Sequence, residues 1–284
     1  MGDVLGIVVG SGKLPIVVAE EARRQGKAIF PLFLSDNDKD YFSPVSGASV
    51  TSLGIWGALE AAREAQVSQL VFAGGLKQQS LEGALEVAGN AKDKDSMGVL
   101  SNLTGYGDNA LVVAIIEWLE KEYGFSILSV TDIIADIGSP AGLLGDIFPS
   151  GEKVWQDIMQ GVRIVQTLGK LDIGQACVVR QGRTVAVEAM GGTNDMLRNA
   201  ESLKISDEKK SGVMVKLLKP EQDRRIDLPT IGDETIKNAA LAGLAGIAVE
   251  AGEVLILERS SVIKEANEKG LFIYGLSGDE LRLS

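Results

Sequence analysis

Apolar runs alternate with amphipathic stretches through the first half of the chain. Val4–Val9 is almost continuously apolar, which is typical of a strand buried on both faces. A tight glycine turn follows, and Leu14 begins a stretch with helical spacing that stops at Gly26. The same rhythm predicts strands at Ile29–Leu34, Gln69–Phe72 and Ile127–Val130, and helices at Ile55–Ala65 and Asp108–Tyr123. Strands that alternate with helices indicate a parallel sheet, whose ligands bind at the carboxyl ends of its strands.

The second half has a different pattern. Val154–Leu168 is amphipathic with helical spacing, and Gln181-Gly182 lies between two strand-like runs, as in a hairpin. The pattern predicts strands at Ala176–Arg180, Thr184–Glu188, Val213–Leu217, Gly246–Val249 and Val254–Leu257, and helices at Glu234–Leu241 and Ser261–Lys269. Antiparallel and parallel strands mixed with helices favour an α+β arrangement here.

A stretch rich in Gly, Pro and Ser, residues 137–151, separates the two patterns. The expected fold class is α/β, with a Rossmann-like parallel-sheet N-terminal domain in residues 1–136. A hinge or linker is expected in 137–151. A mixed α+β C-terminal domain is expected in 152–284, and it contains the candidate catalytic residues.

Composition narrows the choice of partners. The 284 residues carry a net charge of −11, which disfavours nucleic acid as a partner and gives no general attraction to an anionic membrane. The single cysteine, Cys177, lies in an apolar run and is expected to be a buried, inert thiol. With no signal-peptide pattern and no apolar run near the roughly 18 residues that span a bilayer, we expect a cytoplasmic protein.

The chain contains no histidine. Ser-His-Asp and Cys-His catalysis, histidine phosphatases and His-ligated metal sites are therefore excluded. Any acid–base or metal chemistry must use carboxylates, lysine, tyrosine, backbone groups or water.

The turn Gly10-Ser11-Gly12-Lys13-Leu14-Pro15 follows a strand and opens a helix, so its backbone N–H groups could face an anion. It is not a Walker loop, and Pro15 replaces the third glycine of the dinucleotide fingerprint. Direct phosphate contact and a plain tight turn are equally good interpretations of this segment.

The most informative segment is KLLKPEQDRRIDLPTIG, Lys216–Gly232. It gathers four basic residues with Gln222 and the acids Asp223 and Asp227 in an otherwise acidic chain, and it contains the stiffening prolines Pro220 and Pro229. A diphosphate site needs cations against the phosphoryl oxygens and a carboxylate to hold a metal or orient water. A solvated charged loop is the competing interpretation, and it is the commoner one for such runs.

This segment closely resembles the signature of the LpxI family, the UDP-2,3-diacylglucosamine pyrophosphatases of lipid A synthesis, whose members typically read K-x-x-K-P-x-Q-x-x-R-x-D-L-P-T-I-G. The chain keeps every fixed position of that pattern from Lys216 to Gly232. Similar pieces run along the whole chain, namely LGIVVGSGKLP at Leu5–Pro15, FAG at Phe72–Gly74, the GDxxL piece at Asp108, LDIGQA at Leu171–Ala176, AVEAMGGT at Ala186–Thr193, AGLAGIAVEAG at Ala242–Gly252 and GLFIYG at Gly270–Gly275.

The resemblance implies hydrolysis of UDP-2,3-diacylglucosamine to UMP and the lipid product 2,3-diacylglucosamine 1-phosphate (lipid X), by magnesium-assisted attack of water on the α-phosphorus. It implies that Asp227 binds Mg²⁺ or orients the water. Lys216, Lys219 and Arg225 would clamp the diphosphate, and Gln222 would hydrogen-bond the substrate. The further expected substrate-binding residues are Gly10, Gly12, Gly74, Asp108, Thr193 and Thr230.

The chain departs from the family at several positions: members often have lysine where Ala58 stands, Asp where Asn109 stands and His where Thr131 stands. It has Gly191-Gly192-Thr193-Asn194 where members usually have E-G-T-D, with Asp195 as the nearest acid. A non-catalytic protein that binds a nucleotide-sugar or lipid phosphate therefore remains an alternative, although retention of Asp227 in its basic frame favours an enzyme. A dinucleotide oxidoreductase is disfavoured by the missing third glycine. Peripheral contact with the inner membrane and a homo-oligomer stay open.

Overall fold

The computed structural model of the chain describes residues 4–35, 39–43, 45–75, 108–203, 210–220, 222–226 and 228–282, with only the backbone described at 108–112 and 114. Two compact units make up the chain. One contains Met1–Ala135 and Asp223–Asp227, and the other contains Asp136–Gln222 and Leu228–Ser284. No helix within the described ranges has both the length and the apolar character needed to cross a membrane.

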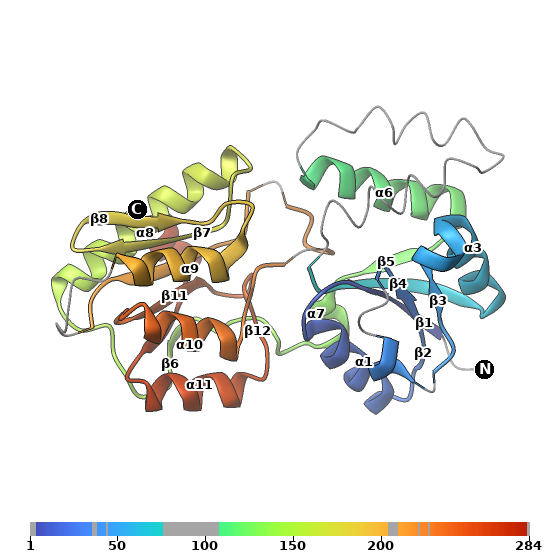
Figure 1. Cartoon of the computed structure of the whole chain (residues 1–284), viewed down its shortest axis with the longest axis horizontal. Coiled ribbons are helices and arrows are strands. Elements are labelled where there is room, and N and C mark those ends of the chain that lie inside the picture. The colour runs from blue at the N-terminus through green and yellow to red at the C-terminus, as the bar shows by residue number, and fades with distance from the viewer. Residues whose placement is uncertain are drawn as a thin grey trace. The chain divides into compact units, whose positions relative to one another are not determined.

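A five-stranded parallel sheet forms the centre of the N-terminal unit (Figure 1). Its strand order is β3-β2-β1-β4-β5, so the order reverses between β1 and β4, as in doubly wound nucleotide-binding folds. The strands are β1 (Val4–Val9), β2 (Ala28–Phe33), β3 (Ala48–Ser49), β4 (Val67–Ala73) and β5 (Ser126–Leu128). The helices are α1 (Leu14–Arg24), α2 (Lys39–Phe42), α3 (Val50–Glu64), α6 (Asp108–Tyr123) and α7 (Val130–Ile133).

Helices cover both faces of this sheet, with α1 and α7 on one side and α3 and α6 on the other (Figure 1). Alternate strand residues such as Val8, Leu32 and Phe72 point to the α3 and α6 side, where they form the larger core. α3 contains a break at Gly54, whose φ of 71° lies outside the helical range. The regular part of α3 therefore starts at Ile55, where the sequence pattern places the start of the helix.

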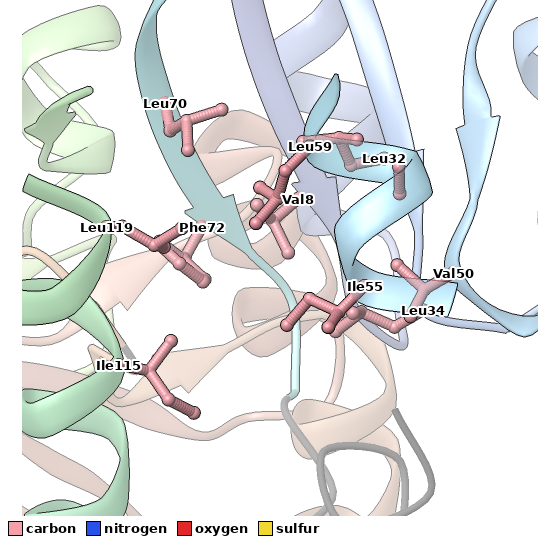
Figure 2. A pocket seen from close by; sticks show the side chains of 11 residues that line it. Val8, Leu32, Leu34, Val50, Ile55, Leu59, Leu70, Phe72, Ile115 and Leu119 are labelled. Carbon is pink, nitrogen blue, oxygen red and sulfur yellow. The ribbon is translucent and has the colours of Figure 1, made fainter. Parts of the chain in front are cut away.

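A small cavity of about 50 Å³ lies on the α3 and α6 side of the sheet (Figure 2). Side chains from β1, β2, β4 and the two helices point into it. Every lining side chain is apolar, so the cavity cannot hold the charged part of a nucleotide. The lining residues are Val8, Leu32, Leu34, Val50, Ile55, Ala58, Leu59, Leu70, Phe72, Ile115 and Leu119.

A six-stranded mixed sheet forms the centre of the C-terminal unit, in the order β6-β13-β11-β9-β7-β8. The middle strands β13, β11 and β9 are parallel to one another, whereas β6, β7 and β8 pair antiparallel with their neighbours. The strands are β6 (Gly142–Leu144), β7 (Ala176–Arg180), β8 (Arg183–Val187), β9 (Val213–Lys216), β11 (Gly246–Glu250) and β13 (Phe272–Leu276). β10 (Thr230–Ile231) and β12 (Leu255–Ile256) form a separate parallel pair.

Helices cover both faces of this sheet, with α8 (Glu152–Lys170) on one face and the three-helix side, made by α9 (Gly192–Ser202), α10 (Asp233–Leu241) and α11 (Arg259–Glu268), on the other (Figure 1). Cys177, Val179 and Val215 face α8, while Val178, Met214 and Ile247 face the three-helix side, as the period of two in a strand requires. A short helix, α12 (Gly278–Arg282), follows β13.

The expected fold class, a parallel sheet followed by a mixed one, is confirmed, but several elements differ from the sequence pattern. Three residues of the predicted linker, Gly142–Leu144, form β6 and pair with β13. The strand predicted at Ile127–Val130 stops at Leu128, because the Ser129 hydroxyl caps α7 by accepting a hydrogen bond from the Thr131 amide. α9 and β13 were not predicted.

Arg180 joins three segments of the C-terminal unit. Its side chain is buried and donates to the carbonyl oxygens of Ser211, Leu203 and Ala242, at 3.2, 3.3 and 2.8 Å. Leu203 and Ala242 are the C-caps of α9 and α10, so the guanidinium lies at the negative ends of two helices. The cation therefore satisfies helix carbonyl groups that would otherwise be buried without donors.

We predict that Arg180→Met lowers the free energy of unfolding by about 3 kcal/mol, because it removes charge-assisted hydrogen bonds to buried carbonyl groups. Urea denaturation followed by circular dichroism measures this change. Arg183→Met, at an exposed position in the same hairpin, is the matched control and should stay within about 0.5 kcal/mol of wild type. Equal effects of the two substitutions would contradict this role for Arg180.

Candidate active site

Lys216 is the last residue of β9, and its ammonium group is buried against two side chains that follow β8. Only 3% of Lys216 is exposed, and Glu188 is 8% exposed. Lys216 Nζ lies 3.3 Å from Glu188 Oε2 and 2.7 Å from Thr193 Oγ1. The Thr193 hydroxyl lies 3.2 Å from the same Glu188 oxygen. These contacts join the end of β9 to the loop after β8 and to the first turn of α9.

The directions of these hydrogen bonds follow from the donors available. An ammonium group has three N–H donors and no acceptor, so Thr193 Oγ1 must accept from Lys216. The hydroxyl proton of Thr193 is then free to be donated to Glu188. Within the described part of the chain, these two contacts use two of the three ammonium hydrogens of Lys216.

Lys219 lies three residues further along the signature. Its Nζ forms an ion pair with Asp172 Oδ1 at 2.8 Å, and the Lys219 side chain is only 17% exposed. Gln222 is buried and closes a turn with Lys219, because its amide N donates to the Lys219 carbonyl at 3.2 Å. The structure therefore brings Lys219 and Gln222 together, as it does Lys216 and Thr193.

Arg225 belongs to the N-terminal unit with the rest of Asp223–Asp227. Its guanidinium contacts both carboxylate oxygens of Asp223, with Nη2–Oδ2 at 2.7 Å, and reaches Glu120 Oε1 at 2.9 Å. Hydrogen bonds from Arg225 hold the pKa of the Asp223 carboxyl below its usual range, and the bonds to Asp223 raise the pKa of Arg225. Ser129 Oγ donates to the Arg224 carbonyl at 3.0 Å, which fixes the same turn.

The two glycine loops at the carboxyl ends of β1 and β4 are joined to each other. The amide groups of Ser11 and Gly75 donate to each other's carbonyl oxygens, at 3.0 and 2.9 Å. A Cβ on Gly10 would lie 2.8 Å from the Gly75 carbonyl oxygen, and one on Gly74 would collide with the Ser11 carbonyl. Close approach of the two loops thus explains Gly10 and Gly74, whereas Gly12 has φ of 93° and open space around it. Their binding of phosphate stays a prediction.

For three other predicted site residues, the structure shows few contacts or none. Thr230 lies in β10, and its hydroxyl donates to the Leu228 carbonyl at 3.0 Å. Asp108 is the first residue of α6, but its side chain lies outside the described part of the chain. Asp227, the candidate catalytic acid and metal ligand, also lies outside the described residues; the turn before it is described as far as Ile226.

Comparison with known proteins agrees with this arrangement. Residues 4–137 match the LpxI N-terminal domain, and residues 140–274 match the LpxI C-terminal domain. The chain belongs to the LpxI family. It is 35% identical over 281 residues to the UDP-2,3-diacylglucosamine pyrophosphatase LpxI of Caulobacter vibrioides, covering 97% of this chain and 98% of that protein. The resemblance seen in the signature is confirmed along nearly the whole chain.

The magnesium expected of an LpxI-family chain can be tested against the acids around the signature. Among the described residues, no three His, Cys, Asp or Glu side chains lie close enough together to hold an ion. Glu188, Asp172 and Asp223 each pair with a lysine or arginine. Mg²⁺ can bind through one or two carboxylates plus phosphate oxygens, so these contacts leave the expected magnesium a prediction.

Two acids that pair with the signature lysines were not predicted from the sequence. Glu188 and Asp172 hold the signature lysines, yet neither was among the predicted site residues. The signal was present, because Asp172 lies in the LDIGQA piece and Glu188 in the AVEAMGGT piece. Each piece contains one acid, which is the partner that a lysine needs when it is buried.

We predict that Glu188→Met lowers the free energy of unfolding by about 3–5 kcal/mol, because it leaves the Lys216 charge buried without a counter-charge. Adding Lys216→Met should restore most of this loss, since two apolar side chains of similar size then pack together. Urea denaturation of the two single variants and the double variant measures the coupling.

The exposed ion pair between Lys264 and Glu268 in α11 is the matched control. Its single Met variants should each change stability by less than about 1 kcal/mol. A cost for Glu188→Met no greater than that for Glu268→Met would show that the Lys216 pair is not needed for the fold.

Proposed function

We propose that the chain hydrolyses the diphosphate of UDP-2,3-diacylglucosamine to give UMP and 2,3-diacylglucosamine 1-phosphate. The observation that carries this proposal is the 35% identity to the Caulobacter vibrioides pyrophosphatase over nearly the full length of both proteins. The buried Lys216 network supports it, because an unreactive charged loop would not bury a lysine and a glutamate together. A role in lipid A synthesis, on the cytoplasmic side of the inner membrane, is part of the same proposal.

The cations of the C-terminal unit are suited to the diphosphate. Among the described residues, Lys216 uses only two of its three ammonium hydrogens, and Glu188 and Thr193 hold the group in place, so little reorganisation is needed when a phosphoryl oxygen arrives. Lys219 supplies a second charge, with Gln222 fixed beside it. Pre-organised charges of this kind stabilise the negative charge that develops on the phosphoryl oxygens.

We propose that Arg225 positions the loop before Asp227, although the sequence analysis expects it to clamp the diphosphate. Its guanidinium is occupied by Asp223 and Glu120, and Ile226 is buried in the core of the N-terminal unit. These contacts anchor the turn that directly precedes Asp227. We therefore assign Arg225 to positioning of the catalytic loop and leave contact with the diphosphate to the two lysines.

Two further groups would complete the site. Gln175 Oε1 is buried beside the start of β7 and has no hydrogen-bond partner among the described residues, so it could accept a bond from a sugar hydroxyl or amide. Mg²⁺, bound by Asp227 and phosphate oxygens, would supply charge neutralisation at the reacting phosphate.

Incubation of the purified chain with UDP-2,3-diacylglucosamine and Mg²⁺ tests the activity directly. We expect UMP and the lipid phosphate in equal amounts, and we expect a chelator to abolish their release. Binding of the substrate without release of UMP would instead support the alternative of a non-catalytic lipid-phosphate or nucleotide-sugar binder.

Asp227→Asn should lower the rate of UMP release by at least about 100-fold with the fold intact, because a metal ligand or water-orienting carboxylate is lost. Asp279→Asn, at an exposed position in α12, is the matched control and should retain full activity. Wild-type turnover in the pure Asp227→Asn protein would show that this assignment is wrong.

The Glu188→Met/Lys216→Met double variant separates catalysis from folding. Its apolar pair should preserve the fold, whereas the loss of the Lys216 charge should cost about 100-fold or more in kcat/KM for UMP release. Thermal unfolding and steady-state kinetics on the same preparation check both statements. A stable double variant with undiminished activity would remove Lys216 from the active site.

A further inference from the structure

Four large apolar side chains are exposed at one end of the C-terminal unit, where α8 and β8 stop. Met190 is completely exposed, and the other three are about half exposed. The exposed fractions are 65% for Leu171, 46% for Ile173, 41% for Val187 and 104% for Met190. We call these four residues the apolar rim.

The two loops that carry the rim run side by side. The backbone at Gly174 approaches Glu188 so closely that a Cβ on this glycine would collide with the Glu188 carbonyl oxygen. The Glu188 amide also donates to the Ala176 carbonyl at 2.8 Å. The loop of Leu171 and Ile173 therefore lies next to the loop of Val187 and Met190, so the four exposed side chains come from neighbouring segments.

The same loops hold the candidate catalytic lysines. Asp172 lies between Leu171 and Ile173 and pairs with Lys219, while Glu188 directly follows Val187 and pairs with Lys216. Asp172 has φ of 52°, a left-handed conformation that non-glycine residues rarely adopt. The acids therefore bind the lysines while their apolar chain neighbours remain exposed, so the rim residues directly adjoin the residues that hold Lys216 and Lys219.

We infer that the apolar rim inserts into the surface of the lipid bilayer from which the chain takes its diacylated substrate. This inference rests on the proposed function, since a substrate with two acyl chains resides in a membrane. Exposed apolar side chains next to a polar site are typical of surfaces that bind membranes or proteins. Insertion would bring Lys216 and Lys219 close to the level of the lipid head groups.

The net charge of the chain indicates whether electrostatic attraction or apolar burial would bind it to a bilayer. A net charge of −11 opposes adsorption to anionic lipid, so binding must come from burial of the rim. Four side chains offer at most a few hundred Å², well below the roughly 800 Å² per partner of a stable protein interface. A bilayer fits this small surface better than a second copy of the chain does.

Sedimentation with neutral phosphatidylcholine vesicles tests the inference. The wild-type chain should bind the vesicles, and added salt should not release it. The triple variant Leu171→Ser/Ile173→Ser/Met190→Ser should lose about tenfold or more in vesicle affinity, because it removes most of the insertable apolar surface. If the triple variant does not fold, Met190→Ser alone gives a smaller loss in the same direction, since that side chain is fully exposed and its replacement should not disturb the fold.

Leu203→Ser/Leu241→Ser is the matched control, because both leucines are more than half exposed but lie at the far ends of α9 and α10. This control should bind vesicles like wild type. No vesicle binding by wild type, equal binding by the triple variant, or an equal loss in the control would each overturn the inference. Dimers of wild type that the triple variant abolishes, without vesicle binding, would assign the rim to self-association and overturn it as well.

Kinetics separate this inference from the proposed function. With substrate in vesicles the triple variant should show a KM about tenfold higher, whereas a water-soluble analogue with short acyl chains should be cleaved as by wild type. A chain inactive on both substrates that still binds vesicles through the rim would refute the proposed function alone. Unchanged kinetics of the triple variant on both substrates would refute membrane insertion of the apolar rim and leave the proposed function standing.

Discussion

The buried pair of Lys216 and Glu188 is the interaction on which the carboxyl edge of the C-terminal sheet depends. A lysine this deeply enclosed is tolerated only if a carboxylate and further hydrogen-bond partners surround its charge. Glu188 meets that need, and Thr193 binds both groups. The charge of Lys216 therefore holds together the end of β9, the end of the β7–β8 hairpin and the start of α9.

Much of the fold follows from local pattern. Strands buried on both faces give unbroken apolar runs, and glycine stops mark the ends of α1 and α6, so these elements were predicted close to their bounds. β13 was missed because Gly275 interrupts a short run; the structure explains this glycine by the Pro140 carbonyl, with which a Cβ would collide. α9 was missed because it starts at a Gly-Gly pair and has few apolar residues.

The contacts of the candidate site were only partly predictable. The signature singled out Lys216 and Lys219, but their partners lie far away in sequence: Glu188 is 28 residues from Lys216, and Asp172 is 47 residues from Lys219. Arg225, whose contact with the diphosphate stays a prediction, also pairs with a distant residue, Glu120, 105 residues away. Pairings of this kind depend on tertiary structure, and a single sequence contains no local pattern that specifies them.

The division of the signature between two units has a consequence for biosynthesis. Residues Asp223–Asp227 belong to the N-terminal unit, and Ile226 lies in its hydrophobic core. The N-terminal unit cannot complete that core when its own strands leave the ribosome; it must wait until most of the C-terminal half has been translated. Fragments cut near residue 136 would each lack part of their structure. The chain must therefore mature as a whole, although its two sheets look like separable domains.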